Sequence, residues 1–204
     1  MINSGSNFKE AVAHQPVVNM GERHELLRQV YLETPAKARI IDGARTSSAN
    51  VPASKALYTE VIPHNANEAY AVGVHTAVGG QSDFPVPGDI LCAALASCLD
   101  STIRIIANRL GVTLTKLEVT AEAEIDVHGT LRFDDKVPVG FQNIRLNVAL
   151  DTEKPVQEAL LDAMLNAAEH SCVIIQTLRN APQIAVTRAP QKQADKELET
   201  ASVA

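Results

Sequence analysis

Two cysteines lie in helical, mostly apolar stretches of this 204-residue chain, and they carry its most distinctive chemistry. Cys98 follows the proline-marked turn at Pro87 in a stretch rich in alanine and leucine. Cys172 lies near the end of a second helical pattern, Ala168–Val173. A cysteine in such a helix can simply be a small core residue, which is our interpretation of Cys92. The paired setting of Cys98 and Cys172 instead favours thiol redox chemistry.

Charge and hydropathy exclude several classes of partner. The formal net charge is -6, and no basic patch is visible that would bind nucleic acid or an anionic membrane. The first fifteen residues have neither the basic start nor the apolar run of a secretory signal. The most apolar stretch, Ile90–Leu110, is interrupted by charged residues, so we expect no membrane span. These features predict a soluble, cytoplasmic protein.

The number of cysteines narrows the chemistry further. Three cysteines in a reducing compartment do not form a structural disulfide framework. Catalysis, metal binding or plain burial remain as their roles. A chain of this length with 46% hydrophobic residues is large enough for one sizeable core, so a single main domain is the default expectation.

The apolar periodicity predicts the elements that position the cysteines. A helix that is apolar nearly all round, from Asp89 to Leu110, should be buried, and Gly111 should end it. A second long helix should begin at a cap on Asp151 or Thr152, with Pro155 in its first turn. Alternating or β-rich runs predict strands at Ala38–Arg45, Lys55–Pro63, Ala69–Val78, Leu114–Val127, Val139–Leu150 and Gln183–Arg188.

This order of elements indicates an α+β fold with antiparallel sheets, a buried central helix and a second long helix. Residues 1–37 form an N-terminal appendage with one helix, whose apolar spacing is visible at Arg23–Leu32. Residues 38–188 form the main domain. Residues 189–204 are a charged C-terminal tail, either mobile or a loosely packed helix.

The order of elements, together with the two cysteine motifs, resembles the OsmC/Ohr family of osmotically inducible and organic hydroperoxide resistance proteins. The segments that carry the resemblance are Pro87–Cys98, Ala168–Val173 with Thr177-Leu178, and Asn108–Gly111. Neither cysteine motif is strong alone, and their order and spacing make the match. The resemblance covers residues 38–188 and leaves the appendage and the tail outside.

The resemblance implies an intertwined homodimer that reduces organic hydroperoxides, with active sites at the subunit interface and with no metal or bound cofactor. Cys98 would be the peroxidatic thiol and Cys172 the resolving thiol. The thiolate would become a sulfenic acid and then a Cys98–Cys172 disulfide, which an external dithiol reduces. An arginine beside Cys98 would favour its thiolate. Arg45 is the candidate, with Arg39 as runner-up.

One position departs from the family's pattern. The usual glutamate, one residue after the proline that starts the helix, would fall on Gly88. Asp89 follows it and could bond the arginine instead, although neighbouring helical positions differ by about 100°.

Two other classes of function stay open. An OsmC-like dimer that lacks efficient catalysis could bind a small apolar ligand at its interface. Alternatively, Cys98 and Cys172 could hold a metal together with His170 or His75, because zinc accepts mixed sulfur and nitrogen ligands. Bound metal in the purified protein would favour this last hypothesis.

Overall fold

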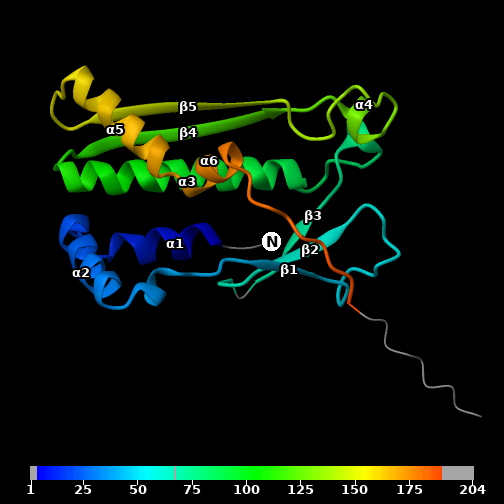
Figure 1. Cartoon of the computed structure of the whole chain (residues 1–204), viewed down its shortest axis with the longest axis horizontal. Helices are drawn as coiled ribbons and strands as arrows, with labels where there is room; N and C mark the ends of the chain where they lie inside the picture. Colours follow the sequence, from blue (N-terminus) through cyan, green and yellow to red (C-terminus); the bar gives the residue numbers. More distant parts are fainter. Residues whose placement is uncertain (1–3, 67, 190–204) are drawn as a thin grey trace, which may run out of the picture.

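The computed structural model describes residues 4–66 and 68–189, and its elements form two groups (Figure 1). We call residues 87–179 the core half and the described residues of 4–86 the N-terminal half. The core half contains α3 (Pro87–Leu110), β4 (Leu114–Glu124), α4 (Val127–Thr130), β5 (Asn143–Thr152), α5 (Glu158–Ser171) and α6 (Val173–Arg179). The N-terminal half contains α1 (Ser4–Ala13), α2 (Met20–Glu33), η1 (Pro35–Ala38), β1 (Ala44–Ser47), β2 (Thr59–Pro63), β3 (Tyr70–Val72) and η2 (Thr76–Val78).

The long helix α3 begins and ends as its sequence predicts. Pro87 occupies the first turn, where its missing N–H costs no hydrogen bond. The Asp89 carboxylate accepts a hydrogen bond of 3.0 Å from the backbone N–H of Val86, which caps the helix start. Gly111 ends the helix in the left-handed region at φ 70°, a conformation that favours glycine.

The core of the molecule lies between α3, the β4–β5 hairpin and the last two helices. The two strands pair antiparallel and alternate half-buried and exposed residues, so one face packs on α3. In Figure 1, α5 and α6 cross α3 while β4 and β5 run beside it. The buried cluster is Leu95, Leu99, Ile103, Ala107, Met164, Ala168, Cys172 and Ile175.

The N-terminal half has little core of its own. Strands β1, β2 and β3 form a second antiparallel sheet in that order, which no other strand of the described residues extends. Val72 and Val86 are the buried apolar residues of this half, and α2 has none. The two halves therefore differ sharply in how far a single chain covers its apolar side chains.

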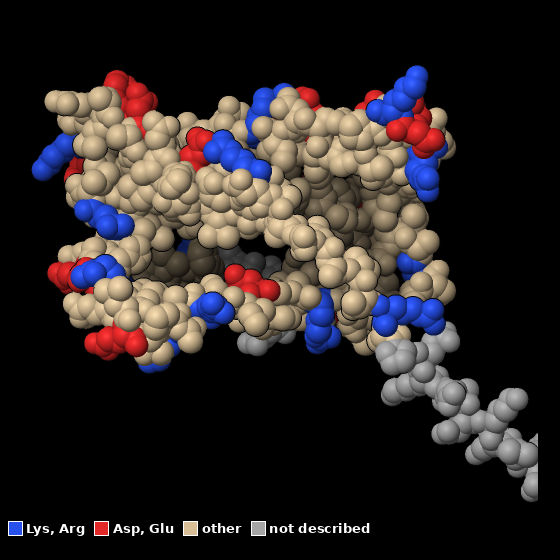
Figure 2. All heavy atoms as spheres, viewed as in Figure 1, with Lys and Arg blue, Asp and Glu red and all other residues tan. Residues whose placement is uncertain are grey.

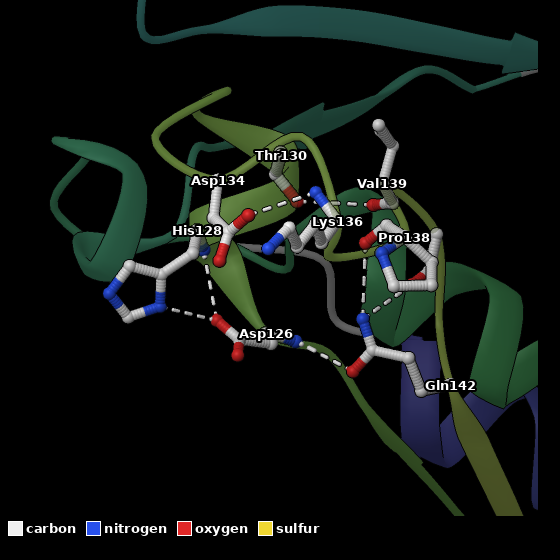
Figure 3. Close-up of polar contacts among 9 residues, drawn as sticks. Asp126, His128, Thr130, Asp134, Lys136, Pro138, Val139 and Gln142 are labelled. Carbon is white, nitrogen blue, oxygen red and sulfur yellow. Dashed lines mark hydrogen bonds and ion pairs between the residues drawn. The ribbon is translucent and has the colours of Figure 1, made fainter.

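The connection between β4 and β5 is a compact polar turn built around the short helix α4 (Figure 3). The Asp126 carboxylate accepts from the backbone N–H of His128 and lies 2.6 Å from its Nδ1, contacts that lower the pKa of Asp126. Gln142 accepts from the N–H of Asp126 and donates to the carbonyl of Pro138. A Cβ on Gly129 would overlap that same carbonyl, so the turn closes only around glycine.

Several predicted elements are confirmed, with boundaries that shift. Helix α3 and strand β4 lie where expected, and α2 contains the predicted 23–32 helix. Strand β5 starts later, at Asn143. The three early strands are shorter than predicted, because only 44–47, 59–63 and 70–72 find a hydrogen-bonded neighbour.

Three predictions are wrong, and a fourth is not tested. The appendage has two helices, α1 and α2, rather than one. The second long helix starts at Glu158 and not near Thr152, because β4 holds Asp151 and Thr152 in the sheet. Residues 183–188 form no strand, since no edge pairs with them in a single chain. The predicted 189–204 tail lies outside the described residues, apart from residue 189.

One helix bears on the expectation of no membrane span. Helix α3 is long and apolar enough to cross a membrane by length and composition, despite its charged residues. Its buried stripe nevertheless packs against β4, α5 and α6, as the core helix of a folded domain does. The rest of its circumference is only half-buried or exposed, so the predicted burial all round is not reached within one chain.

Candidate functional site

Cys98 lies in the middle of α3, on the flank of the buried stripe. It is half-buried and packs against the core cluster, so its thiol borders both the core and the surface. Its backbone carbonyl accepts two extra hydrogen bonds, from Ser101 Oγ at 3.0 Å and from Thr102 Oγ1 at 2.7 Å. Both hydroxyls thus donate within their own helix.

Cys172 lies at the junction of α5 and α6 and is 0% exposed. Its backbone is extended, with φ -73° and ψ 110°, so it ends one helix and begins the next. The break turns α6 back onto α3 and buries Ile175 beside the thiol.

The structure brings the two thiols together as direct neighbours. Burial raises the pKa of the Cys172 thiol above its ordinary value, and the adjacent Cys98 raises it further. The backbone amides of Ile175 and Ile174, at the start of α6, partly oppose this rise. Cys98 and Cys172 are both free thiols in the structure. The predicted pair are thus neighbours, and a disulfide between them stays a prediction.

The other candidates near the cysteines take no part in this contact. Cys92 is half-buried and lies outside the buried cluster, so it is less of a core residue than its sequence setting predicts. His170 is exposed in the last turn of α5. His75 begins η2, where its Nδ1 accepts from the N–H of Ala77 at 2.9 Å.

Both candidate arginines lie in the N-terminal half, away from the core cluster. Arg45 lies on β1, opposite Ile62 of β2, and Arg39 lies at the end of η1. In the described ranges neither side chain forms a hydrogen bond or an ion pair, and both are exposed. The thiols and the arginines therefore belong to different halves of the molecule, with no described contact that joins them.

The start of α3 explains how the chain accommodates Gly88. A Cβ at this position would lie 3.1 Å from Cζ of Phe141, so a larger side chain would displace that ring. The sequence does not single out Phe141, because only the path of the chain between α4 and β5 brings its ring to Gly88. Asp89, the proposed substitute for the glutamate, uses one carboxylate oxygen to cap the helix at Val86.

The described residues lend no geometry to the metal hypothesis. Among residues 4–66 and 68–189, no three side chains of the His, Cys, Asp or Glu type gather as metal ligands. A surface cavity of about 350 Å³ lies elsewhere, between β5 and α5. Apolar residues such as Leu150 and Leu161 share its lining with Lys116, Asp151, Glu158 and Asp162, so it does not match a purely apolar ligand.

The part of the chain that contains both cysteines matches a known protein family. A family model, that of OsmC-like proteins, matches residues 80–187, which is more than half of the chain. This range contains α3, both strands of the core sheet, α5, α6 and the two neighbouring cysteines. The sequence matches none of the curated proteins.

Solved structures show the same fold at low sequence identity. An OsmC-like protein from Mycoplasma pneumoniae is 13% identical, with a TM-score of 0.55 over 70% of this chain and 89% of its own. An organic hydroperoxide resistance protein from Elizabethkingia anophelis is 16% identical, with a TM-score of 0.51 over 70% and 91%. An OsmC-like protein of unknown function from Vibrio cholerae is 12% identical, with a TM-score of 0.52 over 68% and 94%. These likenesses confirm the predicted α+β fold.

Proposed function

The chain belongs to the OsmC family, and from this premise we propose that it is a thiol peroxidase that reduces organic hydroperoxides. The observation that carries the proposal is the contact between two reduced cysteines, one half-buried and one fully buried, inside the core of this fold. The similarity to a protein named for organic hydroperoxide resistance supports the choice of substrate class.

The different surroundings of the two thiols suggest their roles. Cys98 borders the surface and can meet a peroxide, whereas Cys172 has no exposed area. The raised pKa of Cys172 keeps it protonated near neutral pH, and a thiol attacks a peroxide only as the thiolate. We therefore assign the first attack to Cys98 and the second step to Cys172.

The proposed cycle begins and ends with both thiols reduced. The Cys98 thiolate attacks the outer oxygen of the hydroperoxide, the O–O bond breaks, and the alkoxide leaves and takes up a proton to become an alcohol. Cys98 is now a sulfenic acid. The sulfur of Cys172 attacks the sulfenic sulfur, water leaves, and a Cys98–Cys172 disulfide forms. An external dithiol then reduces the disulfide and restores both thiols. No step uses a metal or a bound cofactor.

An arginine beside Cys98 would stabilise its thiolate and orient the peroxide. Because neither Arg45 nor Arg39 meets Cys98 within one chain, we propose that a second copy supplies it, with Arg45 as the first choice. The active site would then lie at the interface of a homodimer.

The exposed surface of the chain supports a homodimer. A compact monomer of 21.9 kDa would expose about 9,300 Å², whereas this chain exposes 16470 Å². Setting aside an extended chain's surface for the residues outside the described ranges, about 3,000 Å², still leaves an excess of about 4,000 Å² or more. Because each chain carries this excess, two copies would have about 8,000 Å² to cover, which is enough for the roughly 2,000 to 5,000 Å² or more that obligate dimers bury in total. We place the dimer in the cytoplasm, where thiols remain reduced.

The decisive test is rapid mixing of the reduced protein with cumene hydroperoxide and with hydrogen peroxide. Cys98→Ser should abolish consumption of the organic peroxide. Cys172→Ser should allow one turnover and then accumulate a sulfinic acid at Cys98, which mass spectrometry detects. Cys92→Ser is the matched control and should react like the wild type. Slow consumption that ignores both substitutions would overturn the proposal and favour a dimer that binds an apolar ligand.

A further inference from the structure

The N-terminal helices precede the residues that match the family, yet they are fixed to the core half at a defined point. Asn108, in the last turn of α3, accepts from the backbone N–H of Met20 at 2.8 Å and donates to the carbonyl of Val18 at 3.0 Å. Asn19 between them caps α2 by accepting from the N–H of Glu22. The start of α2 is thus held at the end of α3.

Helix α2 carries more apolar surface than α3 covers. Leu26, Leu27 and Val30 lie within about 100° of one another on the helical wheel, and we call them the α2 stripe. Leu27 and Val30 are partly covered, whereas Leu26 is 64% exposed. Leu32 is 67% exposed as well, but it points to the opposite side of the helix.

Helix α1 repeats this pattern. Phe8 and Val12 are one turn apart on the same face, and Phe8 is 70% exposed. Val17, in the link to α2, is also exposed. A helical pair with several large apolar residues in water is uncommon on a free surface and marks a contact surface.

The space that these helices face is hollow in a single chain. Figure 2 shows an opening between the N-terminal half and the core half. The uncovered circumference of α3 is rich in half-buried apolar residues. Two apolar layers separated by water would gain free energy from any apolar segment that filled the opening.

We infer that α1 and α2 form a clamp that closes on a second copy of this chain, with the α2 stripe buried against that copy. The excess surface of about 4,000 Å² or more gives the second copy enough area to cover, and the opening lies beside the core half that contains both cysteines of the proposed active site. In a twofold dimer each clamp would hold the other copy. The inference rests on the homodimer proposed above.

The charge of the clamp argues against a membrane as its partner. Residues 4–33 contain three basic residues, Lys9, Arg23 and Arg28, and four acidic residues, Glu10, Glu22, Glu25 and Glu33. Helices that lie on anionic membranes instead have a polar face rich in lysine and arginine. Contact with a second copy of this chain does not require a face rich in lysine and arginine.

Sedimentation equilibrium of the full chain tests the clamp with Leu26→Glu and Leu32→Glu. The two leucines lie on the same helix and have similar exposed fractions. If nothing covered this helix, the two variants should therefore have the same dimer dissociation constant. The clamp predicts that Leu26→Glu raises the dimer dissociation constant about tenfold or more, because a charge would be buried. Leu32→Glu should stay within about twofold of the wild type. Equal constants for the two variants and the wild type would overturn the clamp.

Hydrogen exchange of the unmodified protein provides a second readout that needs no substitution. Amides in residues 20–33 should become more protected above the dimer dissociation constant than below it, because the second copy covers them. Protection that ignores concentration would contradict the clamp. A normal peroxidase rate in the same samples would then keep the proposed function, whereas a monomer at every concentration would overturn both the dimer and the clamp.

Discussion

The core half and the N-terminal half of this chain contain comparable elements, but they treat their apolar side chains differently. The core half buries a stripe of α3 under α5, α6 and a two-stranded sheet, whereas the N-terminal half leaves α2 with no buried residue. The chemistry divides in the same way, with the cysteines in the core half and both candidate arginines in the N-terminal half. One half buries a core within a single chain, and the other carries the exposed apolar residues that the proposed second copy would cover.

The largest expected effect is on the stability of the core half. Ile103→Ala should lower the free energy of unfolding by about 2 to 5 kcal/mol, because Ile103 is fully buried in the cluster and leaves a cavity. Urea unfolding measures it.

Ile41→Ala is the matched substitution in the N-terminal half, where Ile41 is 88% exposed. It should change the free energy of unfolding by less than about 0.5 kcal/mol at protein concentrations below the dimer dissociation constant. A large loss at that dilution would show that this half has a core of its own and would break the comparison.

The second effect concerns chemistry that joins the two halves. Arg45→Ala should lower the rate constant for cumene hydroperoxide by about 100- to 1,000-fold, the usual loss of one charged donor at a reacting oxygen. Stopped-flow kinetics measures it, and Arg39→Ala serves as the control that should remain near the wild-type rate. If the two variants exchange these outcomes, Arg39 is the arginine that serves Cys98. Wild-type rates for both variants would show that neither arginine takes part in catalysis.

The third effect depends on pH. Because the folded protein raises the pKa of Cys172, the unfolded chain releases this proton first as the pH rises. Stability should therefore be complete below about pH 9 and should fall above it, by at most about 1.4 kcal/mol per pH unit. Urea unfolding of the reduced protein between pH 7 and pH 10 measures this slope.

Two alanine variants sharpen this pH dependence. Cys172→Ala should remove the slope, because no buried thiol remains to titrate. Cys92→Ala should keep it. A slope that survives in Cys172→Ala would assign the titration to another group.

The smallest effect is at the point where the halves are joined. Asn108→Ala removes both hydrogen bonds to the start of α2 and should cost about 1 kcal/mol of stability. Hydrogen exchange should also show faster exchange in α2 with no change in β4 or β5. Asn166→Ala, at an exposed position on α5, should have neither effect. Unchanged exchange in α2 would mean that Asn108 does not fix the appendage.

Much of the core half could be predicted because its signals are local. The proline at the start of α3, the glycine at its end and the alternation of β4 depend on neighbouring residues, and each element lies where the pattern indicates. Local signals mislead where a partner strand decides. Asp151 and Thr152 look like helix caps, but pairing with β4 keeps them extended. The 183–188 run alternates like a strand, yet a strand needs a neighbour to bond.

The sequence by itself determined that Cys98 lies on an apolar helix after a proline turn and that Cys172 ends another, because helical periodicity is written into a few successive turns. Only the tertiary structure decided that these thiols meet. Cys172 lies at the junction of α5 and α6, and the packing of these helices on α3 buries it in the cluster that Cys98 borders. Tertiary structure also kept the arginines away from them within one chain, because the two halves pack as separate layers.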